Sequence, residues 1–186
     1  MKLRDVPNLL SLFRILLVPF FIGEFLKSKY ISCLIIFCIS GFSDIVDGYI
    51  ARKYSCESSL GRILDPVADK LTYATVFFCL LSQGKIPLFF VVVFVLVGLA
   101  QGLGTIYVYK TKNNVVKSNI AGKLAGFSMF VFSAILLFNK GELSGAPLYI
   151  LSIIVACAIV IAMLAYFYRY ILSAYVRSSS REENTK

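Results

Sequence analysis

Six long apolar stretches, separated by short polar linkers, dominate this sequence. A helix needs roughly 20 apolar residues to cross a bilayer. Only 16% of the residues are charged and 59% are hydrophobic, whereas about a quarter of a soluble domain is charged. The sequence therefore predicts an all-α integral membrane protein with six transmembrane helices after a short N-terminal interfacial segment. The predicted helices cover residues 9–25, 31–51, 60–81, 86–109, 116–138 and 147–172.

The chain shows no internal repeat, so we expect a single transmembrane domain over residues 1–175 and a polar cytoplasmic tail over residues 176–186. The net charge is +9, and most Lys and Arg residues lie in linkers on one side of the predicted helices. The positive-inside rule places both termini and the linker after residue 51 in the cytoplasm. This arrangement favours a lipid bilayer and anionic ligands as partners, with no nucleic acid. We expect a multi-pass protein of the bacterial cytoplasmic membrane.

Four of the five aspartates lie between residues 44 and 69, inside two of these apolar stretches. Each carboxylate at the centre of a membrane helix costs about 2.5–3.5 kcal/mol. Ionisable residues at membrane depth usually mark a functional site with a partner. The chain has no His, and carboxylate oxygens suit hard divalent cations. We therefore expect Asp44, Asp47, Asp65 and Asp69 to bind Mg²⁺ or Mn²⁺, with two ions bringing the local charge near zero.

The spacing places each pair of aspartates on one face of its helix. Asp44 and Asp47 are three residues apart, and Asp65 and Asp69 are four apart. The linker between the two helices is short, so we expect antiparallel neighbours whose four carboxylates surround one point. The alternative is a packing role, with the acids paired to Arg52, Arg62 and Lys70. It is disfavoured because apolar residues could fill such a role at lower cost.

Small and basic residues accompany the aspartates. Gly48, Ala51 and Gly61 would let a flat ligand approach closely, and Arg52 can hold a phosphate oxygen. Together with the acids they indicate a site for a metal-bound polyphosphate. Arg14 lies inside the first apolar stretch, and two interpretations are open: its side chain snorkels to the surface, or it faces the bundle and a phosphate.

The pattern Asp44-x2-Asp47-Gly48-x2-Ala51-Arg52-x8-Gly61-x3-Asp65-x3-Asp69 resembles the signature of the CDP-alcohol phosphatidyltransferase family. The opening PNLLSLFRILLVPF is also similar to that family. The resemblance implies attack of an alcohol hydroxyl on the β-phosphorus of CDP-diacylglycerol at a cytoplasm-facing site, with release of CMP. It also implies a homodimer.

The resemblance implies roles for individual residues as well. Asp44, Asp47 and Asp65 would be metal ligands, and Asp69 would complete the metal site and act as the general base. The residues implied to contact the CDP-lipid are Gly48, Ala51, Arg52, Gly61, Asn8, Ser11 and Arg14.

The acceptor is expected to be a small or phosphorylated alcohol. The segment GRILDPVADKL resembles phosphatidylglycerophosphate synthases and cardiolipin synthases, which use glycerol 3-phosphate and phosphatidylglycerol respectively. We expect glycerol 3-phosphate, bound by Lys123, Lys117, Lys112, Lys110 and Gln101. The chain departs from the subgroup at residues 99–102, which carry no charge where an Arg and an acid are usual. The competing functions are a divalent-cation transporter, which usually needs a polar route from both sides, and a structural scaffold.

Overall fold

The computed structural model describes residues 6–54, 61–112 and 120–183. Side chains are not described at residues 6–8, 48, 50–52, 54, 61–63, 105–112, 120 and 169–183. The described chain is all-α, as predicted, and its six helices are α1 (Val6–Leu26), α2 (Tyr30–Tyr54), α3 (Gly61–Ser82), α4 (Leu88–Lys112), α5 (Ile120–Phe138) and α6 (Ala146–Glu183).

The helix bounds follow the apolar stretches closely, with one large difference. α6 continues to Glu183, whereas loss of hydropathy led us to expect its end at residue 172. Hydropathy reports where a helix leaves an apolar environment, and polar residues can continue a helix beyond that point. The expected start of the fifth helix at residue 116 lies outside the described residues.

Four helices are long and apolar enough to cross a membrane, within the parts searched: Leu9–Leu26, Tyr30–Asp47, Ala121–Phe138 and Ala146–Tyr168. A shorter apolar helix covers Leu88–Gly104. The chain is therefore a multi-pass membrane protein. α3 lacks such a segment because its first turns carry Asp65, Asp69 and Lys70. A crossing by all six helices stays a prediction, as does the division into a domain at 1–175 and a tail at 176–186.

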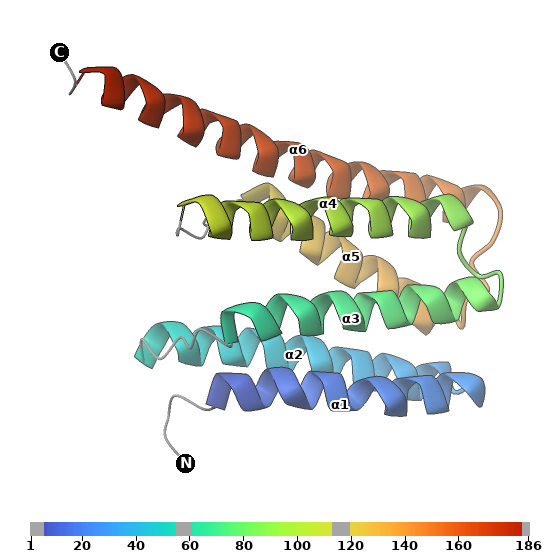
Figure 1. The fold of residues 1–186 in the computed structure, drawn as a ribbon. Coiled ribbons are helices and arrows are strands. Elements are labelled where there is room, and N and C mark those ends of the chain that lie inside the picture. The colour runs from blue at the N-terminus through green and yellow to red at the C-terminus, as the bar shows by residue number, and fades with distance from the viewer. Residues whose placement is uncertain (1–5, 55–60, 113–119, 184–186) are drawn as a thin grey trace. The chain divides into compact units, whose positions relative to one another are not determined.

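The chain forms two compact units, the first comprising residues 1–88 with 130–149 and the second residues 89–129 with 150–186. In the first unit α1, α2 and α3 run alongside one another (Figure 1). α1 packs against both α2 and α3, while α2 and α3 touch each other only slightly. This arrangement differs from the expected direct pairing of α2 with α3. The helix that joins them is α1, so side chains from α1 lie between the two helices that carry the aspartates.

Aromatic side chains fill the interior of the first unit. The Phe37 ring stacks on Phe130, with centroids 5.0 Å apart, and meets Tyr73 edge-on at 5.9 Å. Offset-stacked and edge-to-face pairs of this kind add to the free energy of burial. Gly41 is needed at this contact, because a Cβ there would come within 2.7 Å of the Phe130 ring.

Three helix ends close in the same way, with a residue of positive φ just after the helix. These residues are Ser28 after α1, Gly84 after α3 and Lys140 after α5, and Gly141, which follows Lys140, also has a positive φ. In each turn two backbone N–H groups donate to the last carbonyls of the helix, which satisfies groups that would otherwise lack partners. At Gly141 a side chain would also collide with Lys85, so glycine is required there twice over.

The second unit contains α4, the first half of α5 and most of α6. Within this unit α4 meets α6 at Gly104, where a Cβ would lie 3.6 Å from the Tyr166 ring and 3.8 Å from the Phe167 ring. The side chains of Phe90, Val97 and Ile159 are buried.

Candidate functional site

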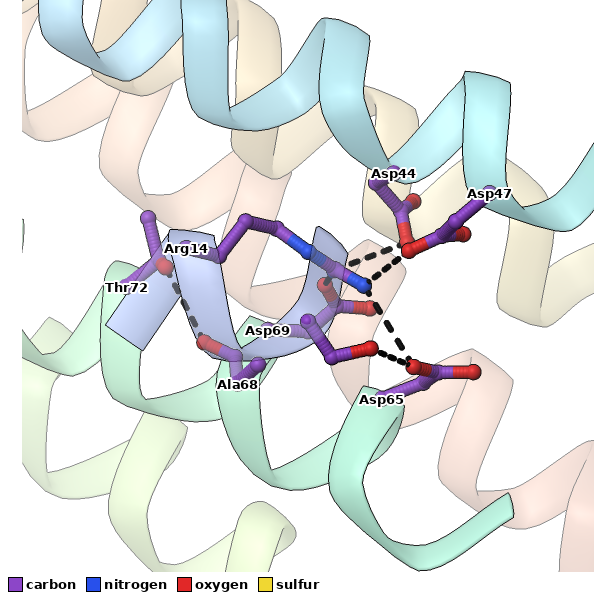
Figure 2. Close-up of polar contacts among 8 residues, drawn as sticks. Arg14, Asp44, Asp47, Asp65, Ala68, Asp69 and Thr72 are labelled. Atoms are coloured by element: carbon purple, nitrogen blue, oxygen red, sulfur yellow. Dashed lines mark hydrogen bonds and ion pairs between the residues drawn. The ribbon is translucent and has the colours of Figure 1, made fainter. Parts of the chain in front are cut away.

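A cluster of six polar residues lies where α1 meets α2 and α3. It contains the four aspartates together with Ser11 and Arg14 from α1, and we refer to these six residues as the carboxylate cluster. Asp44 and Asp47 project from α2, and Asp65 and Asp69 project from α3 (Figure 2). The expected convergence of the four carboxylates is confirmed, but they converge on the guanidinium of Arg14.

Arg14 forms ion pairs with all four aspartates. Nη1 lies 2.8 Å from Asp44 Oδ1 and also donates a hydrogen bond to Asp69 Oδ1. Nη2 lies 2.5 Å from Asp47 Oδ2 and 3.6 Å from Asp65 Oδ1. One planar guanidinium with several donors can serve several acceptors at once. Arg14 therefore links carboxylates on two helices that scarcely touch each other.

The residues of this cluster differ in burial, and we call the buried part its closed back and the partly exposed part its open front. The side chains of Arg14 and Asp47 are only 1% and 4% exposed, whereas those of Asp44, Asp65 and Asp69 are 46%, 36% and 43% exposed. Arg14 is therefore not snorkelling to the surface. It faces the bundle, as one of the two interpretations predicted, and its carboxylate partners face outward enough to meet a ligand.

Ser11 completes the α1 contribution to the cluster. Its hydroxyl donates a hydrogen bond to Asp65 Oδ1, and the residue is fully buried. Ser11 and Arg14 are three residues apart, so they share one face of α1. Thr72, one turn after Ala68, bonds instead to the backbone of its own helix, with its hydroxyl 3.0 Å from the Ala68 carbonyl (Figure 2).

The sequence analysis does not predict the ion pairs between Arg14 and the aspartates. It predicts that Arg14 contacts the CDP-lipid. One signal was available: Arg14 is the only basic residue in the apolar stretch 9–25. A lone charge on an apolar helix needs a compensating partner as much as the aspartates do. The packing alternative named Arg52 and Arg62, whose side chains the structure does not describe.

The chemistry of the donor set fits a divalent cation. Four carboxylates and one guanidinium leave three negative charges uncompensated within the cluster when all are ionised. Carboxylate oxygens are the ligands that Mg²⁺ and Mn²⁺ prefer. Among the described residues, no three acidic or sulfur side chains adopt an arrangement that could itself hold a metal ion. In the structure the carboxylates instead surround Arg14, and metal binding by the aspartates stays a prediction.

For the small and basic residues expected around the nucleotide, the structure describes the position in a helix but not the side chain. Gly48, Ala51 and Arg52 follow Asp47 within α2, Gly61 begins α3, and Asn8 lies near the start of α1. The side chains at these positions lie outside the described residues, so their contacts with a CDP-lipid stay predictions.

The residues expected at the acceptor belong to the second unit. Gln101 is partly exposed on α4, and Lys123 is exposed on α5. Lys110 and Lys112 lie on α4 with undescribed side chains, and Lys117 lies outside the described residues. The structure therefore brings together Ser11, Arg14 and the four aspartates. A common acceptor site for the other residues is untested.

Residues 4–172 match the CDP-alcohol phosphatidyltransferase family, so the chain belongs to that family. It is an enzyme of phospholipid biosynthesis that uses a CDP-alcohol and an alcohol acceptor, rather than a transporter or a scaffold.

Several relatives carry a more particular name, CDP-diacylglycerol–glycerol-3-phosphate 3-phosphatidyltransferase. The Rickettsia felis protein of that name is 32% identical over 149 residues, which cover 75% of this chain and 78% of the relative. The Rickettsia typhi protein is 32% identical over 150 residues, covering 75% and 80% respectively. The Aquifex aeolicus protein is 42% identical over 78 residues, 42% of each chain.

Proposed function

We propose that this enzyme transfers a phosphatidyl group from CDP-diacylglycerol to glycerol 3-phosphate and releases CMP. The observation that carries the proposal is the carboxylate cluster, because four acids from two helices converge in a chain of this family and three of them are partly exposed. The named relatives, which match three quarters of the chain, support glycerol 3-phosphate as the acceptor.

In this proposal Asp44, Asp47, Asp65 and Asp69 hold two Mg²⁺ or Mn²⁺ ions. When bound, such ions supply charge neutralisation at the pyrophosphate and stabilise the departing phosphate. The packing of α2 and α3 on α1 holds the four carboxylates close together, so that the pyrophosphate meets them in a fixed orientation.

Asp69 is the proposed general base. Its carboxylate is 43% exposed and so can meet an acceptor at the open front of the cluster. It accepts the hydroxyl proton as the acceptor oxygen forms a bond to the β-phosphorus. The bond between that phosphorus and the oxygen bridging to the α-phosphorus breaks, and CMP leaves with the electron pair. Proton transfer of this kind contributes about 10²–10⁴-fold to a rate.

The donor is proposed to lie against the same end of α1, α2 and α3. Gly48, Ala51 and Gly61 would admit the cytidine and its phosphates. The polar residues proposed to contact them are Asn8, Ser11, Arg14 and Arg52. The open, partly exposed carboxylates at this end of the unit support that placement.

The acceptor pocket is proposed to include the lysines of the second unit and Gln101. A phosphorylated acceptor needs cations beyond the metal site. Residues 99–102 are uncharged, and this departure makes phosphatidylglycerol the alternative acceptor. We further propose a homodimer in the bacterial cytoplasmic membrane, with six crossings and the active site facing the cytoplasm.

The test is an acceptor panel with the purified full chain. CDP-diacylglycerol and Mn²⁺ or Mg²⁺ are supplied with glycerol 3-phosphate, phosphatidylglycerol, serine, inositol or inositol phosphate, and CMP is measured. We expect release with glycerol 3-phosphate. Release with phosphatidylglycerol alone would transfer the proposal to cardiolipin synthesis, and no release with any acceptor would overturn it.

Lys123→Gln tests the acceptor pocket. We expect the KM for glycerol 3-phosphate to rise more than the KM for CDP-diacylglycerol, because an exposed lysine contacts only the phosphorylated acceptor in this proposal. Lys27→Gln, which removes a cation paired with Glu24, is the matched control. Equal changes in both KM values for Lys123→Gln would contradict an acceptor role.

A further inference from the structure

The guanidinium of Arg14 holds the central position among the four carboxylates. It is paired with every one of them and is only 1% exposed. Each aspartate turns one carboxylate oxygen toward the guanidinium, so a divalent cation bound at the centre of the cluster would compete with Arg14 for those oxygens. Two such cations cannot share this position, because their repulsion within about 4 Å is strong in a partly buried site. Arg14 and a divalent ion are therefore alternatives.

Arg14 also takes the place of a direct contact between α2 and α3. These helices touch only slightly, and each packs on α1. Without a cation between them, the acidic pairs on α2 and α3 would repel each other. In this structure the guanidinium supplies that cation and neutralises one of the four charges.

The space around Arg14 limits where its side chain can go. A cavity of only about 10 Å³ borders it, lined mainly by apolar residues such as Leu17, Val18 and Ile36. Such a volume holds about one water molecule, so this cavity is too small to receive a displaced guanidinium. The carboxylates of Asp44, Asp65 and Asp69 are partly exposed, so the side of the cluster that they form is the more accessible one.

We infer that Arg14 is a built-in counter-ion of the carboxylate cluster, which divalent ions displace and which then turns outward to the phosphates of the donor. The inference rests on the proposed function, because it requires the aspartates to bind divalent ions. It makes cation binding and donor binding interdependent: the ions free the guanidinium, and the donor phosphates stabilise it in its outward position. The opposing possibility is a fixed strut, in which Arg14 stays in place and orients the carboxylates for the ion.

The two possibilities predict opposite changes in metal affinity. We would measure Mn²⁺ binding to the purified full chain by the electron paramagnetic resonance of free Mn²⁺, without lipid substrate. If Arg14 competes with the ion, Arg14→Gln binds Mn²⁺ at least about tenfold more tightly than wild type, because the competing state is gone. A fixed strut predicts weaker binding. Lys27→Gln, matched in the change made but distant from the cluster, should leave the affinity unchanged.

Thermal unfolding supplies a second readout. Without Mn²⁺, Arg14→Gln should unfold at a lower temperature than wild type because the four carboxylates lack a counter-ion. Saturating Mn²⁺ should raise its unfolding temperature by more than it raises that of wild type, because tighter binding to the folded state stabilises it further.

Arg14→Lys keeps the test decisive if Arg14→Gln does not fold. A single ammonium cannot serve four carboxylates as a guanidinium does, so this variant should also bind Mn²⁺ more tightly than wild type. Unchanged or weaker Mn²⁺ binding in the folded Arg14 variants, with CMP release by wild type intact, would overturn the inference alone. Absence of both Mn²⁺ binding and CMP release in wild type would overturn the proposed function, and the inference with it.

Discussion

The two ends of the first unit use polar groups in opposite ways. At the far end from the aspartates, the Tyr30 hydroxyl donates to the Gln83 amide, and Lys85 Nζ lies 4.5 Å from the Tyr30 ring centroid. Lys85 also donates to the Lys140 carbonyl at 2.5 Å. These contacts join segments more than 50 residues apart in the chain with neutral acceptors. At the aspartate end the acceptors are four carboxylates.

This difference shows that holding the helices together does not require buried acids. A phenol, an amide, a carbonyl and one lysine accomplish it at the far end. The neutral hydrogen bond between Tyr30 and Gln83 contributes about 0.5–1.5 kcal/mol, and neither bond there carries the desolvation cost of a buried ion pair. The four aspartates are therefore better explained by a ligand than by packing. Substitutions at the aspartate end should then affect activity, and substitutions at the far end should affect stability alone.

The largest effect should come from Asp69→Asn. The amide keeps the shape of the side chain but cannot accept the acceptor's proton, so CMP release should fall by at least about 100-fold. The unfolding temperature should stay near that of wild type, because the change also removes one of four mutually repelling charges. Both are measured on the purified protein with CDP-diacylglycerol binding as the control. Near-normal turnover would show that Asp69 is not the base.

Ser11→Ala should have the next largest effect, and on stability first. Its buried hydroxyl donates to a carboxylate, and hydrogen bonds to charged groups contribute about 1.5–3 kcal/mol. Denaturant unfolding in detergent should register a loss of that order. A variant as stable as wild type would mean that Asp65 finds another donor and that this bond is dispensable.

Tyr30→Phe, at the far end from the aspartates, should lower stability without changing activity. It removes the hydroxyl bonded to Gln83 but keeps the ring beneath Lys85, so we expect a loss of about 1 kcal/mol in stability. CMP release per folded molecule should be unchanged. A lowered kcat in a folded Tyr30→Phe protein would mean that the two ends are coupled, and the contrast drawn between them would fail.

Lys27→Gln should have the smallest effect. Lys27 Nζ lies 3.0 Å from Glu24 Oε1, but its side chain is 63% exposed, and exposed ion pairs contribute about 0–1 kcal/mol. Glu24 also keeps Lys29 within 3.7 Å. A change in unfolding free energy well above 1 kcal/mol would show that the far end depends on charge after all.

The sequence predicted which aspartates lie together better than it predicted the position of Arg14 on α1. Spacings of three and four residues put Asp44 with Asp47 and Asp65 with Asp69 on shared helix faces, and helical geometry alone settles that. The position of Arg14 was open, because an arginine on an apolar helix can turn outward or inward. Its inward position depends on α1 packing against both α2 and α3, a tertiary arrangement that local periodicity does not contain.

The fold shows the same division. Runs of apolar residues located all six helices, because the bilayer requires long uninterrupted helices. These apolar runs predicted the wrong end for α6, which continues to Glu183, because hydropathy does not indicate helices outside an apolar environment. The acceptor residues were the least accessible to sequence reasoning. Lysines near the ends of membrane helices serve equally well as membrane-surface anchors, and only their contacts with a substrate distinguish the two roles.

The matching turns after α1 and α3 have a mechanical consequence. Ser28 and Gly84 close these helices at the end away from the aspartates, so a tilt of α1 or α3 about that end would displace the aspartate end the most. A helix of this length spans about 30 Å, so a tilt of about 5° moves the aspartate end by about 2–3 Å. A displacement of that size is comparable to a metal–oxygen bond length, about 2.0–2.1 Å for Mg²⁺, so a small tilt would be enough to change whether the carboxylates can bind one ion.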